Sequence, residues 1–467
     1  MLGLLLAPLS CVPPVRDVDA PLTLPTAFSK SGTVPLPEKW WTALGDAQLN
    51  ALIDQALKGN FGLRSAWDRL DQAWAIAAQR GAARSPTLDG SADVSRTAQK
   101  TRAAPTTHAT GYSLGLVAAY EVDLWGRVRA TEDAAKLDAL ATAEDLSAAA
   151  MTLTAEVADT WYQLVEQRGQ LALLDAQMKI NRDYLEVITL KFRRGQASAT
   201  DVLQQRQLVE SIRGERTLAA SAAEVLGHQL AALLGRAPRS ITLTTPKALP
   251  PLPALPRTGV PAAWIRRRPD VRAAELRVQA ADRDLAAAIA DRFPRLTLSA
   301  TAQTSSRIFT DLFDTWLAGI AAGLDAPLLD GGRRRAQVEE NRAALSGRLN
   351  AYGDTVVDSL REVEDALTQE ARQGEYVASL QGQLALSKQA TDQTRDSYTK
   401  GTMEFTRYLT TLLEHQRLER TALQARRTLV QYRINLYRAL AGGWTPARPE
   451  GPPAPGRPDK PSTRERP

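Results

Sequence analysis

Residues 185–201 read LEVITLKFRRGQASATD, a stretch that ends one long helix and begins another. Gly195 follows the basic residue Arg194. Glycine readily takes the left-handed conformation that closes a helix, and a basic side chain favours the C-terminal end of the helix dipole. Ser198 and Asp201 have the spacing of a capping box, which opens a helix. The stretch therefore predicts a tight turn between two antiparallel helices.

The helix that ends at this turn is very long. Residues 127–194 contain no proline and only one glycine, Gly169, and residues 333–400 also lack proline. At 1.5 Å per residue, each run spans about 100 Å. A helix of that length cannot be buried in one globular core, so it must pack lengthwise against other helices. The sequence predicts two long antiparallel hairpins, at residues 127–235 and 333–441.

The same unit occurs twice along the chain. Pro86 and Pro294 are 208 residues apart, and the two tip glycines, Gly195 and Gly401, are 206 residues apart. Lys400 precedes Gly401, just as a basic residue precedes Gly195. Internal repetition of this kind indicates duplicated structural units. Each unit is expected to contain a helix, a strand pair, a very long helix, a tight turn and a second helix.

Strand pairs are expected at about residues 86–124 and 294–328. Within them, residues 112–122 and 296–303 alternate apolar with polar or small side chains, as a strand with one apolar face does. A soluble hairpin would show the same alternation. Four strands cannot close a barrel, and an open edge in lipid leaves backbone groups unsatisfied. Two or three chains would supply eight or twelve strands, and the residues alone leave both assemblies open.

Composition and charge argue against several function classes. The 58 basic and 52 acidic residues interleave, with a net charge of +6, which is typical of solvated helix faces. We therefore expect no nucleic-acid partner. No stretch reaches about 18 uninterrupted apolar residues, so no transmembrane helix is predicted. The three histidines share no metal-ligand spacing, and no nucleotide-binding or nucleophile motif occurs. We expect no enzyme activity, cofactor or metal site.

The two ends of the chain differ from the repeats. Residues 1–10 form an apolar leader directly before Cys11, the only cysteine. This arrangement resembles a bacterial lipoprotein signal in which Cys11 would be acylated, and a free cysteine is the alternative. Residues 11–37 are rich in proline and are expected to form an extended arm. Residues 444–467 are proline-rich and charged and are expected to be disordered.

Several ordered motifs resemble those of a known family. They are Trp40-Trp41, Tyr120–Arg127 (YEVDLWGR), Arg267–Glu275 (RRPDVRAAE), Pro327–Arg333 (PLLDGGR) and Arg361–Leu367 (REVEDAL). In this order and spacing, they resemble TolC-like outer membrane efflux factors of the NodT and OprM type, which are lipoproteins of tripartite efflux systems. The resemblance runs from about residue 40 to residue 443.

The resemblance implies a mainly α fold with a small β part, divided into a first repeat at residues 38–250 and a second at residues 251–443. Three copies would form a homotrimer, with a twelve-stranded β-barrel in outer membrane lipid and an α-barrel tunnel through the periplasm. The chain would be a passive outer membrane channel for drugs or other small molecules. Its partners would be a periplasmic adaptor and an inner membrane pump of the resistance-nodulation-division class.

Two alternatives stay open beside the efflux channel. The same fold could serve as the exit duct of a type I protein secretion system. A structural coiled-coil protein of the cell envelope would explain the long helices but not the duplicated strand pairs.

The turns of the hairpins are the first candidate site. Gly195 and Gly401, with Arg194 and Lys400, lie where a hairpin about 100 Å long can reach a partner far from the outer membrane. We expect these tips to dock the adaptor.

The second candidate site is a charged constriction just above the second tip. Asp392 and Asp396 are four residues apart and share a helix face, Arg395 lies between them, and Arg407 follows the turn. In a trimer, like charges would ring a narrow throat and bind a cation, while the arginines would bridge adjacent protomers. The alternative is a solvated outer stripe.

Overall fold

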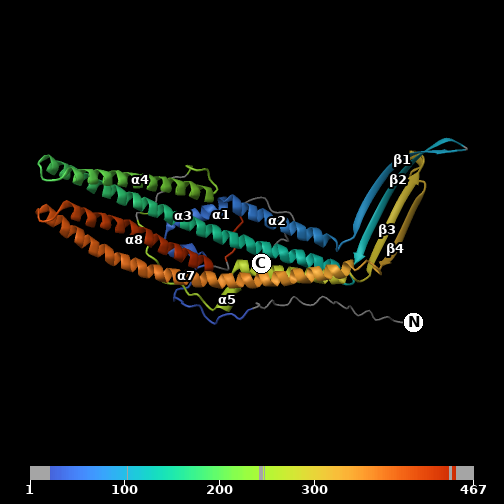
Figure 1. Ribbon diagram of the computed structural model, residues 1–467. Coiled ribbons are helices and arrows are strands. Elements are labelled where there is room, and N and C mark those ends of the chain that lie inside the picture. The colour runs from blue at the N-terminus through green and yellow to red at the C-terminus, as the bar shows by residue number, and fades with distance from the viewer. Residues whose placement is uncertain (1–21, 103, 241–245, 247, 441–443, 449–467) are drawn as a thin grey trace, which may run out of the picture.

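The computed structural model describes residues 22–102, 104–240, 246, 248–440 and 444–448. The expected leader, Cys11 and the start of the arm lie outside these residues. The chain is elongated and mainly helical, with one small sheet at one end and two helical tips at the other (Figure 1). Among the described residues, none of the helices combines the length and apolar character needed to cross a membrane.

The elements follow one another in the order helices, strand pair and long hairpin, twice. They are η1 (Trp40–Leu44), α1 (Ala47–Gly59), α2 (Phe61–Ala82), β1 (Thr87–Thr101), β2 (Ala104–Val122), α3 (Arg127–Arg193), α4 (Ala199–Leu233), α5 (Pro261–Ile265), α6 (Pro269–Ala290), β3 (Arg295–Ser306), η2 (Phe309–Asp311), β4 (Trp316–Asp325), α7 (Arg333–Thr399) and α8 (Phe405–Leu440).

The two long helices begin in the same way. α3 and α7 each contain 67 residues, and each follows a glycine in the left-handed region, Gly126 with φ 74° and Gly332 with φ 86°. The Asp123 carboxylate accepts hydrogen bonds from the first amides of α3 at 3.1 and 2.8 Å. Asp330 accepts corresponding bonds at the start of α7, at 3.1 and 3.2 Å. The carboxylates satisfy amide groups that have no partner inside the helix.

The core lies at the waist, the middle of the elongated molecule, where η1, α1 and α2 pack against α3. Trp40 and Trp41 are each only 1% exposed. The indole N–H of Trp40 donates to Thr154 at 3.2 Å, and that of Trp161 donates to Asp46 at 2.8 Å. The tryptophan pair that opens the first repeat therefore fixes the short N-terminal helices to the long helix.

A buried ion pair holds the second hairpin together at the same level. The Arg433 side chain on α8 is 4% exposed and makes two hydrogen bonds to Glu370 on α7, at 2.7 and 2.6 Å. Its guanidinium also donates to the carbonyl oxygen of Pro253 at 2.6 Å. Arg433 thus joins α7, α8 and the connection between the repeats.

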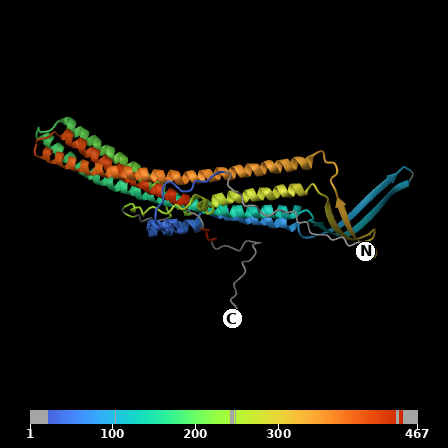
Figure 2. The same ribbon diagram turned by 90° about the horizontal axis from the view of Figure 1, so that it is seen from below.

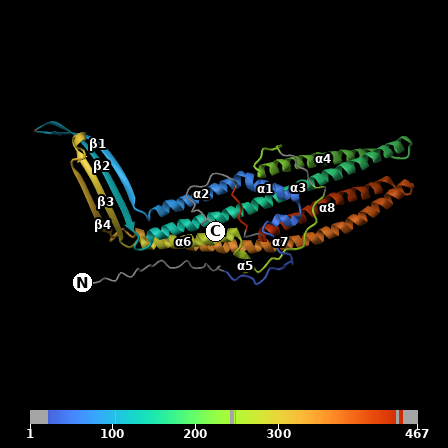
Figure 3. The same cartoon turned by 180° about the vertical axis from the view of Figure 1, so that it is seen from behind.

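The described part of the arm, residues 22–37, runs beside α5 on the side of the molecule away from α2 (Figures 1 and 3). Phe28 packs edge-on against Trp264 with ring centroids 5.4 Å apart. Val34 forms a single parallel bridge with Pro256. These contacts attach the arm to the connection between the repeats.

Residues 444–448, at the start of the expected disordered tail, contact the rest of the chain. The Trp444 ring lies 5.3 Å from that of Trp41, and Arg448 pairs with Asp71 and lies 5.5 Å from the centre of the Trp67 ring. Partial burial of the Trp444 side chain against the waist core explains why residues 444–448 pack. Residues 449–467 lie outside the described residues.

The four strands form one antiparallel sheet in the order β1-β2-β3-β4. Residues opposite each other in an antiparallel pair share a face. Leu116 pairs with Ala302, and Ala300 pairs with Ile320. By this register one face is apolar from strand to strand, and it carries Leu88, Ala92, Val94, Tyr112, Leu114, Leu116, Leu296, Leu298, Ala300, Trp316, Ile320 and Leu324.

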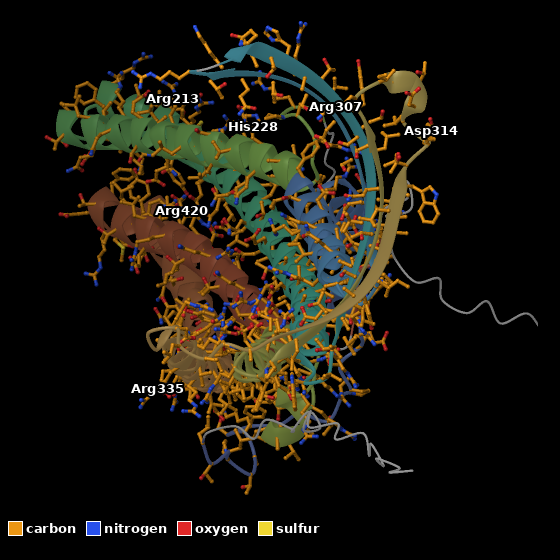
Figure 4. All side chains as sticks on the ribbon, turned by 90° about the vertical axis from the view of Figure 1, so that its right-hand side faces the viewer. Arg213, His228, Arg307, Asp314, Arg335 and Arg420 are labelled. Atoms are coloured by element: carbon orange, nitrogen blue, oxygen red, sulfur yellow. The ribbon has the colours of Figure 1, made fainter. Side chains whose placement is uncertain are left out.

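The opposite face of the sheet is mainly polar or small, although Val117 and Leu317 also lie on it. It carries Asp89, Ser91, Asp93, Ser113, Gly115, Thr297, Ser299, Thr301 and Gln303. The apolar face is open to its surroundings, since Ile320 is 90% exposed and Trp316 is 75% exposed. β1 and β4 are edge strands with no further partner among the described residues. Seen from its outer end, the sheet is curved (Figure 4).

Candidate functional site at the hairpin tips

The two helical turns lie side by side at the end of the molecule opposite the sheet (Figures 1 and 2). Gly195 has φ 71° and Gly401 has φ 73°. Beyond them, the amide of Gln196 donates to the Lys191 carbonyl at 2.9 Å, and the amide of Thr402 donates to the Ser397 carbonyl at 3.0 Å. Both helices therefore end in the same hydrogen-bonded glycine motif.

The basic residues that cap the two helices are exposed. Arg194 caps α3 and Lys400 caps α7. No side chain or backbone atom lies within 4 Å of the position that a Cβ would take at either tip glycine. The structure therefore brings all four tip residues named from the sequence together on one exposed surface.

An aromatic cluster, which sequence reasoning missed, joins the two tips. Tyr398, Phe405 and Tyr408 of the second hairpin form it together with Tyr184 of the first. The rings of Tyr184 and Tyr408 are 5.0 Å apart, and the Lys191 ammonium lies 4.0 Å from the centre of the Tyr398 ring. Burial, and then the hydrogen bond with Tyr184, raise the pKa of the Tyr408 hydroxyl. Aromatic residues on the helices that flank the tip glycines were the available signal.

A layer of buried amides lies above this aromatic cluster and was also missed. Gln177 and Asn181 on α3, Gln205 on α4 and Gln416 on α8 are each at most 3% exposed. Asn181 donates to the Gln416 side chain at 3.2 Å, and Gln205 donates to the Asn181 side chain at 3.1 Å. Buried hydrogen bonds of this kind fix the relative positions of the helices that they join.

The candidate gate residues are only partly brought together. Arg395 pairs with Asp392 at 3.3 Å and with Asp396 at 3.8 Å, and Lys388 donates to Asp392 at 2.9 Å. The hydrogen bond from Lys388 lowers the pKa of Asp392, and the charges of Lys388 and Arg395 add to this effect. Arg407 is exposed at the start of α8 and has no ion pair with another described residue.

No group of three or more histidine, cysteine or acidic side chains in the described part of the chain is arranged to hold a metal ion. The ion pairs of Asp392 and Asp396 join residues of a single helix, α7. What this end of the molecule offers is two exposed basic turns on a packed four-helix tip.

Comparisons with known proteins agree with this architecture. The family model of the outer membrane efflux protein matches residues 52–236 and 260–442, one match in each repeat. The solvent efflux pump outer membrane protein SrpC of Pseudomonas putida is 30% identical over 419 residues, which cover 86% of each chain. The outer membrane protein OprJ of Pseudomonas aeruginosa is 30% identical, over 88% of this chain and 87% of that protein.

A solved structure shows the same fold over nearly the whole chain. The outer-membrane channel OprN matches with a TM-score of 0.83 and 28% sequence identity, covering 92% of this chain and 99% of that one. The family match covers both repeats and both long hairpins. The chain therefore belongs to the outer membrane efflux protein family, whose members are outer membrane channels and not enzymes.

Proposed function

We propose that three copies of this chain assemble into the outer membrane channel of a tripartite efflux system. The sheet carries the proposal. Its apolar face is exposed, its opposite face is polar, and both of its edges lack a partner within the described chain. Backbone groups at an open edge cost several kcal/mol each in hydrocarbon, so the edges need strands from other copies. Three copies supply twelve strands, which close into a β-barrel with the polar face inward.

The helical hairpins extend the passage away from the membrane. α3 and α7 are each about 100 Å long and lead away from the sheet with α6 packed between them, so three copies would surround a tunnel. Such a duct selects little by itself, and we propose that it passes drugs or other small molecules delivered by a pump. The efflux function named for SrpC supports this assignment over protein secretion.

The tips are the proposed contact with the periplasmic adaptor. Gly195, Gly401, Arg194 and Lys400 form the exposed end farthest from the sheet, and the adaptor would link this end to an inner membrane pump of the resistance-nodulation-division class. Acylation of Cys11 would add a lipid anchor to the membrane attachment made by the sheet.

Cross-linking between the edge strands tests the closed trimer. A full-length chain with Cys11→Ser, Ser91→Cys on β1 and Ala321→Cys on β4 is treated in membranes with a flexible bis-maleimide. Covalent dimers and trimers are expected, with no larger species, because three pairs of edges close the ring. The matched control carries cysteines at Ser113 and Ser305, which pair within one chain, and should give no covalent oligomer.

Two outcomes would contradict the trimer. A continuous ladder above the trimer would indicate open association of edge strands. Covalent products that end at the dimer would indicate closure with eight strands, as the strand count alone also allows.

A further inference from the structure

The β1–β2 hairpin extends beyond the other two strands at the end of the sheet farthest from the helices (Figure 1). β3 pairs with β2 from Tyr112 inward, whereas β1 continues to pair with β2 out to Thr101. The extension carries Arg96, Lys100 and Arg102 and contains no acidic residue. None of these three cations forms an ion pair with another described residue. An uncompensated positive charge therefore lies at the outer end of the sheet.

Register places part of this charge on the apolar face. On β1, Arg96 follows Val94 by two residues, and Ala98 follows Arg96 by two. Ala98 pairs with His108 on β2. Since alternate residues of a strand share a face, Arg96 and His108 continue the face that carries Val94. This face is apolar up to the level of Tyr112 and becomes basic beyond it.

Aromatic residues mark the level at which the face changes. The rings of Tyr112 and Phe309 lie 5.6 Å apart, and Trp316 is paired with Thr304 one step inward. Tyrosine and tryptophan favour the boundary between hydrocarbon and headgroups. A charged side chain on the lipid-facing side of a sheet is costly at the bilayer centre and is tolerated near its surface. Arg96 and His108 therefore lie where lipid headgroups begin.

Directly inward of the basic end, the apolar face is hollowed. A cavity of about 670 Å³ lies there. Small residues of β1 and leucines of β2 line it on one side, and aromatic residues at the β3–β4 connection line it on another. These residues are Gly90, Ala92, Leu114, Leu116, Phe313 and Trp316.

We propose that this region binds a phosphorylated, acylated lipid of the surrounding leaflet. An acyl chain fills the cavity, and the lipid phosphate contacts Arg96 and His108. The inference rests on the proposed insertion of the sheet into the membrane. A guanidinium binds a phosphate through two parallel hydrogen bonds. A soluble phosphate would leave the apolar cavity unfilled, whereas an acyl chain fills it.

Fluorescence quenching in vesicles tests this site. The full-length protein is reconstituted in phosphatidylcholine that contains a small fraction of brominated phosphatidic acid or, separately, brominated phosphatidylcholine. The contribution of Trp316 is isolated by comparison with Trp316→Phe. We expect the brominated phosphatidic acid to quench Trp316 about fivefold more effectively, the enrichment expected from one basic side chain near an anionic lipid.

Two variants locate the effect. Arg96→Gln combined with His108→Gln should quench equally with both lipids while retaining the conductance of the unmodified protein. Arg213→Gln removes an exposed arginine on α4, a helix far from the sheet (Figure 1), and should keep the preference. A preference that survives in the double variant would overturn the assigned site.

The outcome in the unmodified protein separates this inference from the proposed function. Equal quenching by the two brominated lipids would overturn the lipid site while leaving the sheet in the membrane. If neither lipid quenches Trp316, the sheet does not lie in lipid, and the proposed channel fails together with the site.

Discussion

Gly401 offers a sharp test of the tip geometry, because its substitution should act through the backbone alone. Gly401 has φ 73°, and no atom lies within 4 Å of a Cβ placed there. A left-handed conformation costs a residue with a side chain about 1–2 kcal/mol. Alanine is less flexible than glycine in the unfolded chain, which offsets roughly 0.5 kcal/mol of this cost. Gly401→Ala should therefore weaken the turn by about 1 kcal/mol, and Gly401→Asn by less.

Gly382 is the matched control. It lies within α7, and a Cβ there also meets no atom within 4 Å. Because its backbone is helical, Gly382→Ala should instead stabilise the helix by about 0.5–1 kcal/mol. The same substitution should thus have opposite signs at two open positions of one helical hairpin.

Hydrogen exchange measured by mass spectrometry reads this difference locally. The amide of Thr402, which donates to the Ser397 carbonyl, should exchange about fivefold faster in Gly401→Ala. Export should fall in Gly401→Val while the trimer persists, since the proposed docking surface changes and the sheet does not. Unchanged exchange in Gly401→Ala, or normal export by Gly401→Val at normal abundance, would refute the reasoning.

Three further predictions concern the gate, the buried ion pair and the anchor. Asp392→Ala with Asp396→Ala should raise resting conductance and abolish block by divalent cations. Because the pKa of Asp392 is lowered, its carboxylate stays ionised as the pH falls. Block in the unmodified protein should therefore be constant between about pH 8 and about pH 5. Wild-type conductance and block in that variant would place the gate elsewhere. Arg433→Ala leaves Glu370 buried without a partner and should lower the free energy of unfolding by about 3–5 kcal/mol in urea titrations, and a loss below about 1 kcal/mol would contradict the burial of the pair. Mass spectrometry should find a diacylglyceryl group on Cys11, whereas Cys11→Ser should stay in the membrane through its sheet; an unmodified Cys11 with residues 1–10 retained would exclude the anchor.

Features with local causes could be predicted from the sequence. The capping box of Ser198 and Asp201 is confirmed, with bonds of 3.0 and 3.1 Å in the two directions. Gly195 and Gly401 both close helices in the left-handed region. The alternation along β2 and β3 indicated two chemically different faces, and the register extends them across all four strands. In each case the determinant lies within a few residues of the feature.

Contacts between distant segments could not be predicted in this way. Tyr184 and Tyr408 meet at the tip because two hairpins pack side by side, and neither hairpin alone determines that contact. Trp444 follows the last helix, in a segment whose composition favours disorder, and it packs only because Trp41 offers a surface at the waist. Arg407 shows the opposite case, since closeness in sequence to the other gate candidates does not bring its side chain to them.

Conductance in a planar lipid bilayer tests the proposed channel most directly. The full-length protein, purified as a trimer, should produce discrete unit conductance steps when it inserts. Asp392→Ala with Asp396→Ala, tested in parallel, separates a closed gate from a missing pore, since loss of the gate should raise the unit step. A correctly folded trimer that inserts into the bilayer and passes no current, in the unmodified protein and in this variant alike, would contradict the proposed channel.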